Sequence, residues 1–126
     1  MSEEKIAEKP SSAHEELSQF QYTILCSLAD RPMYGLELKQ AIQEAYGAEI
    51  NHGRLYPNLD RLVQMGLLEK SKRDNRSNEY AITERGLFRA LERIQWEVAE
   101  IIDDHDRAQE INYEITEALK KSLHAD

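Results

Sequence analysis

The chain has 126 residues, of which 40% are hydrophobic and 32% charged, and its formal net charge is −8. This length accommodates one globular domain with an appended helix, and no apolar run approaches the roughly 20 residues that cross a bilayer. The acidic N-terminal residues lack the apolar core of a signal peptide, so we expect a cytoplasmic protein with no membrane partner. A single cysteine, Cys26, excludes an internal disulfide.

The net charge conceals an uneven distribution. Between residues 50 and 90 the chain has eight basic and five acidic residues, a balance of +3, whereas the remainder has eight basic and nineteen acidic residues, a balance of −11. A basic segment of this kind is typical of a surface that binds phosphate groups. A salt-bridged surface with chance asymmetry is the alternative, and charge alone does not separate the two.

The N-terminal region is expected to contain a tail and a first helix. Residues 1–11 are polar and contain Pro10, which predicts a disordered tail. Residues 12–15 have the form of a capping box, so a helix is expected to follow them and to end before Pro32. Cys26 is expected to be buried and inert on this helix. The apolar stripe of the helix consists of Leu17, Phe20, Ile24 and Leu28.

Two further helices are predicted. The second runs from about Tyr34 to Tyr46, and Gly47 is a plausible C-cap. The third occupies residues 51–65 and is closed by Gly66. Pro57 is unfavourable inside this segment because it removes an amide donor, so the regular helix is expected to begin near Gly53, with Pro57 close to its first turn. The apolar residues of the third helix are Leu55, Leu59, Leu62 and Val63.

The hydrophobic period changes after the third helix. Residues 67–72 and 79–82 are short, strand-like runs, and the polar residues between them are rich in turn formers. This pattern predicts a two-stranded hairpin with a basic tip. Residues 83–86 then open a long final helix, which we assign to residues 87–126.

The final helix has the clearest periodicity in the chain. Apolar residues recur in steps of four and three, and the same register continues through His105, Ala108 and Asn112. A sustained seven-residue repeat predicts a coiled-coil seam that a second copy of the chain covers. A helix that folds back on its own domain, or a break near Asp103, is the alternative. The expected homodimer interface consists of Leu87, Leu91, Ile94, Val98, Ile101, Ile115 and Leu119.

Three helices followed by a basic hairpin are the element order of the winged helix-turn-helix. We therefore predict a mainly α fold with a small β-hairpin, in which residues 12–86 form a winged-helix DNA-binding domain. The third helix of this motif enters the major groove, and arginine and asparagine there pair with guanine and adenine. The candidate reading residues are Asn51, His52, Arg54, Asn58 and Arg61, with Tyr56 as a phosphate donor.

The hairpin, or wing, is expected to contact the DNA backbone or minor groove through Lys72, Arg73 and Arg76. Each assignment has an alternative that needs no DNA. Arg54 and Arg61 could instead pair with Asp60 or Glu49, Tyr56 could be a core residue, and basic loop tips occur on many surfaces.

Three motifs in order resemble PadR-family transcriptional regulators: Met33-Tyr34-Gly35-Leu36-Glu37-Leu38, the segment from Gly53 to Leu68, and the segment from Tyr80 to Gly86. The resemblance extends from about residue 18 to 90. It implies a winged helix, a C-terminal helix that builds the dimer, and repression of genes for stress or for handling toxic small molecules. It assigns Gly53, Arg54, Tyr56, Asn58 and Arg61 to the recognition helix. Residues 51–54 and the acidic composition also resemble members of the family from salt-loving archaea.

Other functional classes find less support in the sequence. The four histidines, His14, His52, His105 and His124, lie far apart, and no zinc-protease or phosphate-loop motif is present. We therefore predict no catalytic residue, metal or cofactor. A winged-helix module that binds proteins is an alternative, although such a module needs no basic groups on both the third helix and the wing.

One residue of the final helix suggests a ligand. Trp96 lies off the seam, on the side of Arg89 and Arg93. Some PadR-like proteins use a tryptophan of this helix to stack planar ligands, which makes Trp96 a candidate for binding a small aromatic effector. Packing of Trp96 on the first helix is the alternative.

Overall fold

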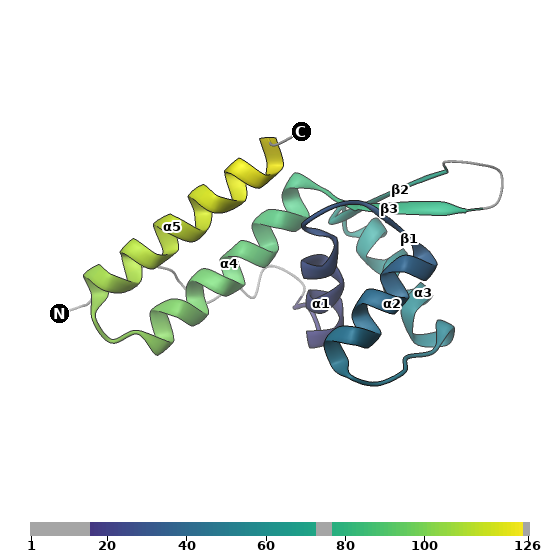
Figure 1. The fold of residues 1–126 in the computed structure, drawn as a ribbon, viewed down its shortest axis with the longest axis horizontal. Helices are drawn as coiled ribbons and strands as arrows, with labels where there is room; N and C mark the ends of the chain where they lie inside the picture. The colour runs from purple at the N-terminus through teal and green to yellow at the C-terminus, as the bar shows by residue number, and fades with distance from the viewer. Residues whose placement is uncertain (1–15, 73–76, 125–126) are drawn as a thin grey trace. The chain divides into compact units, whose positions relative to one another are not determined.

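The computed structural model describes residues 16–72 and 77–124 (Figure 1). These residues divide into a unit from Leu17 to Arg89 and a unit that begins at Ala90. Their elements in chain order are α1 (Gln19–Leu28), β1 (Met33–Tyr34), α2 (Gly35–Tyr46), α3 (His52–Gln64), β2 (Leu68–Lys72), β3 (Asn78–Ile82), α4 (Glu84–Ile101) and α5 (His105–His124).

Helix α1 begins later than the sequence predicted. Its N-cap is Ser18, whose hydroxyl accepts a hydrogen bond from the Gln21 backbone N–H at 3.1 Å. The Gln21 side chain in turn accepts one from the Ser18 N–H at 3.0 Å. This reciprocal capping box has the role that we assigned to residues 12–15, which lie outside the described residues together with the rest of the predicted tail. Leu17 therefore precedes the helix instead of lying on its stripe.

Cys26 is exposed on α1, so the expectation of a buried cysteine is wrong. The helix buries Phe20, Ile24, Leu25 and Leu28. With about 3.6 residues per turn, position 26 lies nearly opposite the centre of that face. Apolar neighbours in sequence therefore did not imply apolar neighbours in space.

Helices α2 and α3 confirm the second and third predicted helices. Gly47 follows α2 in the left-handed conformation, with φ 69°, and Gly66 has φ 79° just beyond α3. Asn51 caps α3 by accepting a hydrogen bond from the Arg54 N–H at 2.8 Å. Pro57 lies inside the helix, so the Gly53 carbonyl lacks the helical N–H donor that any other residue would supply.

The strands form a three-stranded antiparallel sheet in the order β1-β3-β2. Leu68 to Lys72 pair with Ile82 to Asn78, which confirms the predicted hairpin. Its tip, with Arg73 and Arg76, lies outside the described residues. The third strand, β1, was not predicted, and it places Met33 opposite Tyr80 and Tyr34 opposite Glu79.

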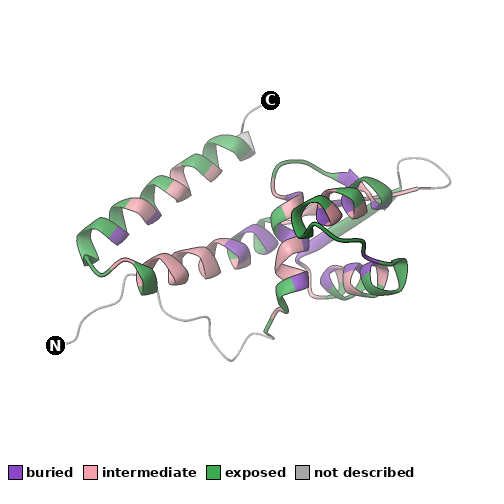
Figure 2. Cartoon of the chain, turned by 60° about the horizontal axis from the view of Figure 1, so that its bottom comes forward, coloured by how far each residue is buried: buried purple, intermediate pink, exposed green. Residues whose placement is uncertain are grey.

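The core of the unit Leu17–Arg89 lies between the three N-terminal helices and the sheet (Figure 2). Each helix contributes apolar residues at helical spacing, and the sheet contributes one face. The most deeply buried side chains are Ile24, Leu25, Leu28, Leu38, Ile42, Leu55, Leu59, Leu62, Leu67 and Tyr80. The third helix is therefore fixed by its leucines, which leaves its opposite face to solvent.

Thr83 joins the hairpin to α4. Its N–H donates to the Leu67 carbonyl at 3.1 Å, and its hydroxyl donates to the Gly66 carbonyl at 2.8 Å. The same hydroxyl accepts a hydrogen bond from the Gly86 N–H at 3.0 Å. Gly86 is needed at this junction because a Cβ there would collide with the Leu67 carbonyl oxygen. The start of α4 is thus held tightly against the base of the wing.

The C-terminal unit differs from the single long helix that the sequence predicted. Residues 102–104 are not helical, and Asp104 caps α5 by accepting a hydrogen bond from the Arg107 N–H at 3.1 Å. Aspartate favours helix caps over helix interiors, which explains the break. Asn112 donates to the Gln95 carbonyl at 3.2 Å, and α5 runs antiparallel beside α4 (Figure 1).

This helical hairpin makes the prediction of one continuous seam wrong and confirms the alternative of a break near Asp103. Ala108 and Asn112 occupy predicted seam positions, and both are buried in their own chain. Gln95 also donates to the Thr116 hydroxyl at 3.0 Å. Part of the surface that we assigned to a second copy is therefore covered by α5.

Candidate nucleic-acid interface

The outward face of α3 is polar at its N-terminal end. Leu55, Leu59 and Leu62 turn inward, and the candidate reading residues lie on or near the opposite side. Five of them are exposed and two, Tyr56 and Asn58, are half-buried. The exposed ones are Asn51, His52, Gly53, Arg54 and Arg61. The fold thus places six of the seven residues that the sequence singled out on α3 and the seventh, Asn51, at its N-cap.

Arg54 is held by an aromatic ring of α1. Its guanidinium carbon lies 4.0 Å from the centre of the Phe20 ring. The ion pair with Asp60 that we considered as an alternative is absent among the described residues, where Asp60 lies 3.9 Å from Lys70. Stacking uses the flat face of a guanidinium and leaves its N–H edge available. The geometry therefore suits bidentate hydrogen bonding by Arg54 to a base.

Asn58 has both ends of its amide engaged. Its Nδ2 donates to the Arg54 carbonyl at 2.8 Å, and its Oδ1 accepts a hydrogen bond from Gln21 Nε2 at 3.0 Å. Reading an adenine would require both bonds to break. This arrangement favours a supporting role for Asn58 over the base-reading role that the sequence suggested.

Tyr56 lies between α3 and the start of α2. Its ring centre is 5.5 Å from that of His52, and its hydroxyl lies so close to Gly35 that a Cβ there would collide with it. Tyr56 and Gly35 line a pocket of about 280 Å³ together with Tyr34, Leu36, Ser77, Asn78 and Tyr80. Tyr56 is thus partly a packing residue, and its hydroxyl end lies against the start of α2.

Tyr80 forms the buried wall of this pocket. Burial raises the pKa of its phenol, the negative charge of Asp60 and the neighbouring Tyr56 raise it further, and a hydrogen bond with Asn78 opposes the shift. The phenol is therefore neutral at physiological pH.

Within the described residues, the basic side chains of the wing are Lys70 and Lys72, both on β2. Lys72 ends β2 and is exposed, and Lys70 makes the 3.9 Å ion pair with Asp60. An exposed pair at that distance contributes about 0–1 kcal/mol, so Lys70 can exchange Asp60 for a phosphate at small cost. Arg73 and Arg76, the other predicted wing contacts, lie outside the described residues.

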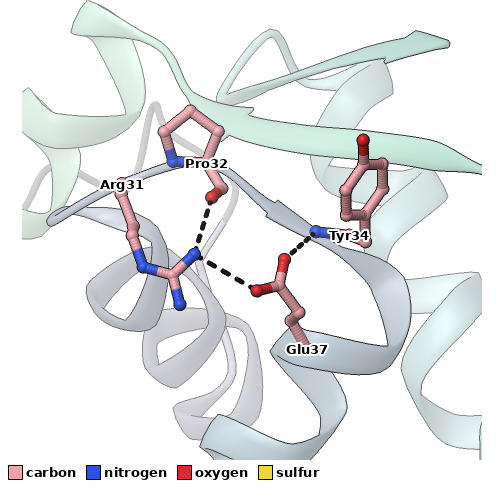
Figure 3. Close-up of polar contacts among 4 residues, drawn as sticks. All are labelled: Arg31, Pro32, Tyr34 and Glu37. Atoms are coloured by element: carbon pink, nitrogen blue, oxygen red, sulfur yellow. Dashed lines mark hydrogen bonds and ion pairs between the residues drawn. The ribbon is translucent and has the colours of Figure 1, made fainter. Parts of the chain in front are cut away.

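The turn that precedes α2 contains a polar cluster that the sequence analysis missed (Figure 3). Arg31 donates to the Pro32 carbonyl at 3.3 Å and pairs with Glu37 at 3.4 Å, and Glu37 accepts a hydrogen bond from the Tyr34 N–H at 3.0 Å. Glu37 stands three residues after Tyr34, which is the spacing of a capping box and the signal that could have revealed the cluster. These bonds fix the start of α2, against which Tyr56 packs.

The C-terminal helices carry the predicted interface residues at different depths. Leu87 is buried, Ile101 is 76% exposed, and the other five positions are half-buried. Tyr113, which was not predicted, is 67% exposed. Trp96 is half-buried on α4. The described helices include none that is long and apolar enough to span a membrane.

Comparison with known proteins gives consistent matches. The sequence model of the transcriptional regulator PadR-like family matches residues 24–93. RosR from H. salinarum is 42% identical, and the alignment covers 82% of this chain and 94% of RosR with a TM-score of 0.69. A PadR-like transcription factor from Bacteroides fragilis is 27% identical, with 67% of this chain and 86% of that chain covered and a TM-score of 0.57.

A curated relative extends the matches to a longer protein. An uncharacterised 37.1 kDa protein of a Streptomyces fradiae transposon is 32% identical over 66 residues, which are 52% of this chain. The matched region is only 19% of that protein. The present chain thus spans about a fifth of the length of this relative.

Proposed function

The chain belongs to the PadR-like family of transcriptional regulators, and we propose that it is a repressor that binds a roughly palindromic operator as a homodimer. The observation that carries the proposal is the polar outward face of α3, with exposed Asn51, His52 and Arg54 at its N-terminal end. In a winged helix this end of the third helix meets the base edges in the major groove.

Two arginines of α3 have separate roles in this proposal. Arg54 and Arg61 are seven residues apart, so they share a helix face at a distance of about 10 Å along the axis. Arg54, stacked on Phe20, donates to a guanine through its free edge. Arg61 reaches a second base or a phosphate, while Lys72, Arg73 and Arg76 of the wing hold the backbone and set the register.

In this proposal the homodimer forms through the α4–α5 hairpin. Ile101 at 76% and Tyr113 at 67% exposure leave large apolar side chains of this hairpin in solvent, and exposed apolar surface is what a protein interface covers. A two-fold axis would place the two recognition helices about 34 Å apart, one helical turn of DNA. Of the seven predicted interface residues, Leu91, Ile94, Val98, Ile101, Ile115 and Leu119 retain exposed surface for this contact.

The oligomeric state can be tested at Ile101. The variant Ile101→Glu places a charge in the proposed interface and should convert a dimer into a monomer in sedimentation equilibrium. Ala45→Glu, at an exposed position of α2 outside the proposed interface, serves as the control. A dimer that persists in Ile101→Glu would place the interface elsewhere.

A planar aromatic effector at Trp96 is a further part of the proposal, supported by the half-buried position of Trp96 on α4. Binding should quench the fluorescence of this only tryptophan in a saturable manner at constant ionic strength. Trp96→Phe should weaken the effect of the same compound on DNA binding. Absence of quenching across a broad panel of planar compounds would count against an effector at this residue.

The acidic remainder of the chain suggests adaptation to high salt. It has a charge of −11 outside residues 50–90, and at 1 M salt the Debye length is about 3 Å. Ordinary counterion release would oppose DNA binding under these conditions. We propose that acidic residues near the DNA take up cations on binding, so that affinity stays flat or rises with salt. A conventional steep fall of affinity with salt would remove this part of the proposal.

The central test is a binding titration over a salt series, with a duplex that the protein selects from a randomised library and a shuffled duplex as the control. Arg54→Ala should lose about 1–3 kcal/mol of binding free energy and relax specificity at one base pair. Arg107→Ala removes the same charge from exposed α5, where Arg107 pairs with Glu110, and should bind like the wild type. Failure of the wild type to select any duplex would favour the protein-interaction alternative.

A further inference from the structure

We propose that the first turn of α1 positions the base-reading side chains of α3, because Gln21 holds Asn58 and Phe20 holds Arg54. Operator discrimination then depends on two residues of α1 that act through α3 and need no contact with DNA of their own. This inference rests on the proposed function of α3 as the recognition helix. It assigns Gln21 and Phe20 as positioning residues.

Gln21 connects two helices through a single amide. Its Oε1 accepts a hydrogen bond from the Ser18 N–H at 3.0 Å, and its Nε2 donates to Asn58 Oδ1 at 3.0 Å across 37 residues of sequence. The cap of α1 therefore fixes the orientation of the amide, and the amide fixes Asn58. A planar group bonded at both ends has little freedom to rotate, which makes it a rigid link between the helices.

The link reaches α3 where the helix is weakest. Pro57 deprives the Gly53 carbonyl of its helical donor, so the turn that contains Arg54 has one backbone bond fewer than a regular helix. Asn58 Nδ2 donates to the Arg54 carbonyl at 2.8 Å within this same turn. Gln21 thus supports, through Asn58, the stretch of backbone from which Arg54 projects.

Phe20 controls the side chain of Arg54 directly. The Phe20 ring is only 4% exposed and meets Tyr46 edge-on, with ring centres 6.0 Å apart. A ring fixed in this way limits the orientations open to the guanidinium, whose carbon lies over the ring at 4.0 Å from its centre. Bidentate bonding to guanine requires the guanidinium plane to match the plane of the base. Because the guanidinium is already oriented before binding, Arg54 loses less conformational entropy on binding than a freely rotating arginine would.

The variant Gln21→Glu separates the two bonds of Gln21. Its carboxylate can still accept from the Ser18 N–H, as glutamate does in an ordinary capping box, but it has no donor for Asn58. A reversal of the Asn58 amide would restore that contact only by taking Nδ2 from the Arg54 carbonyl. Phe20→Leu keeps an apolar side chain and removes the ring face. Gln40→Glu adds the same charge on exposed α2 and serves as the control.

The measurement is the ratio of affinity for the selected duplex to affinity for duplexes in which each G·C pair is replaced singly. Gln21→Glu should lower this ratio about 2- to 10-fold at one base pair, and Phe20→Leu about 2- to 5-fold at the same pair. A uniform electrostatic effect of the new charge cancels in the ratio. The salt slope should stay unchanged because the phosphate contacts are the same, and Gln40→Glu should match the wild type.

Two results would overturn the inference while the proposed function stands. One is a wild-type ratio in both variants at a base pair where Arg54→Ala abolishes discrimination. The other is an equal loss at every base pair together with a lower Tm, which would indicate a purely structural role. If the wild type selects no duplex, the proposed function fails and this inference fails with it. Gln21 is half-buried, so Gln21→Glu decides the matter even where Phe20→Leu does not fold.

Discussion

Replacement of Gly86 by alanine tests how tightly the wing holds the start of α4. The added Cβ would collide with the Leu67 carbonyl oxygen and lie 2.9 Å from Ile82 Cγ1. That carbonyl cannot turn away easily, because it accepts the Thr83 N–H at 3.1 Å. Gly86 itself donates its N–H to the Thr83 hydroxyl at 3.0 Å. The strain must therefore be relieved by moving the helix away from the hairpin.

The expected loss follows from two opposing effects. Forcing a methyl group into filled space costs about 1–3 kcal/mol, and the better helix propensity of alanine returns about 1 kcal/mol at most. Because the Cβ would meet a backbone carbonyl instead of a flexible side chain, the cost should lie at the upper end of this range. We therefore expect Gly86→Ala to lower the free energy of unfolding by about 2 kcal/mol. Each kcal/mol corresponds to about 4–8 °C in Tm for a domain of roughly 60–100 residues.

Urea unfolding followed by circular dichroism would measure this loss, with the m-value as a check that the transition is comparable. Gly53→Ala is the matched control. At the exposed start of α3 the added Cβ would have Asn51 Oδ1 at 3.3 Å as its nearest neighbour, so stability should change by less than about 1 kcal/mol. A wild-type Tm for Gly86→Ala, or equal losses in the two variants, would refute the reasoning.

Two further predictions concern α5 and the sheet. Asp104→Ala should cost about 1 kcal/mol by removing the N-cap of α5, whereas Asp104→Asn keeps a capping side chain; equal helix content in the two variants by circular dichroism would contradict this. Because burial and the charge of Asp60 raise the pKa of Tyr80, the folded state binds its phenolic proton more tightly than the unfolded state. Stability that is present below pH about 10 should fall as the pH rises through the raised pKa. Tyr80→Phe should flatten that decline in denaturant titrations at increasing pH, and an unchanged decline would exclude Tyr80 as its source.

The parts of the fold that the sequence predicted are those that local signals determine. Gly47 and Gly66 end two helices because both adopt positive φ, a conformation for which glycine is the least costly residue. The spacing of Leu55, Leu59 and Leu62 orients α3 without reference to any distant residue. Strand β1 was missed because two residues show no alternation, and Met33 becomes a strand residue only opposite Tyr80.

The candidate site shows the same division between local and distant contacts. The exposure of His52 and Arg54 follows from the helical period and the buried leucines, which the sequence displays. The hydrogen bond from Gln21 to Asn58 joins residues 37 positions apart, and no periodicity in the sequence predicts it. Asn58 on the proposed recognition helix was therefore assigned to base reading, although its amide is already bonded within the chain at both ends.

The seven-residue repeat of the C-terminal region illustrates what periodicity leaves undetermined. A seven-residue repeat indicates that one face of a helix packs against an apolar partner, but it does not indicate which helix is that partner. Asp104 interrupts the helix by capping α5, and the bonds from Gln95 to Asn112 and Thr116 then select the antiparallel helix of the same chain. The proposed second copy could contact only the surface that this hairpin leaves exposed, which includes Ile101 of α4 and Tyr113 of α5. A dimer built there would contain four packed helices in place of a two-stranded coiled coil, so its interface should depend on α5 as much as on α4.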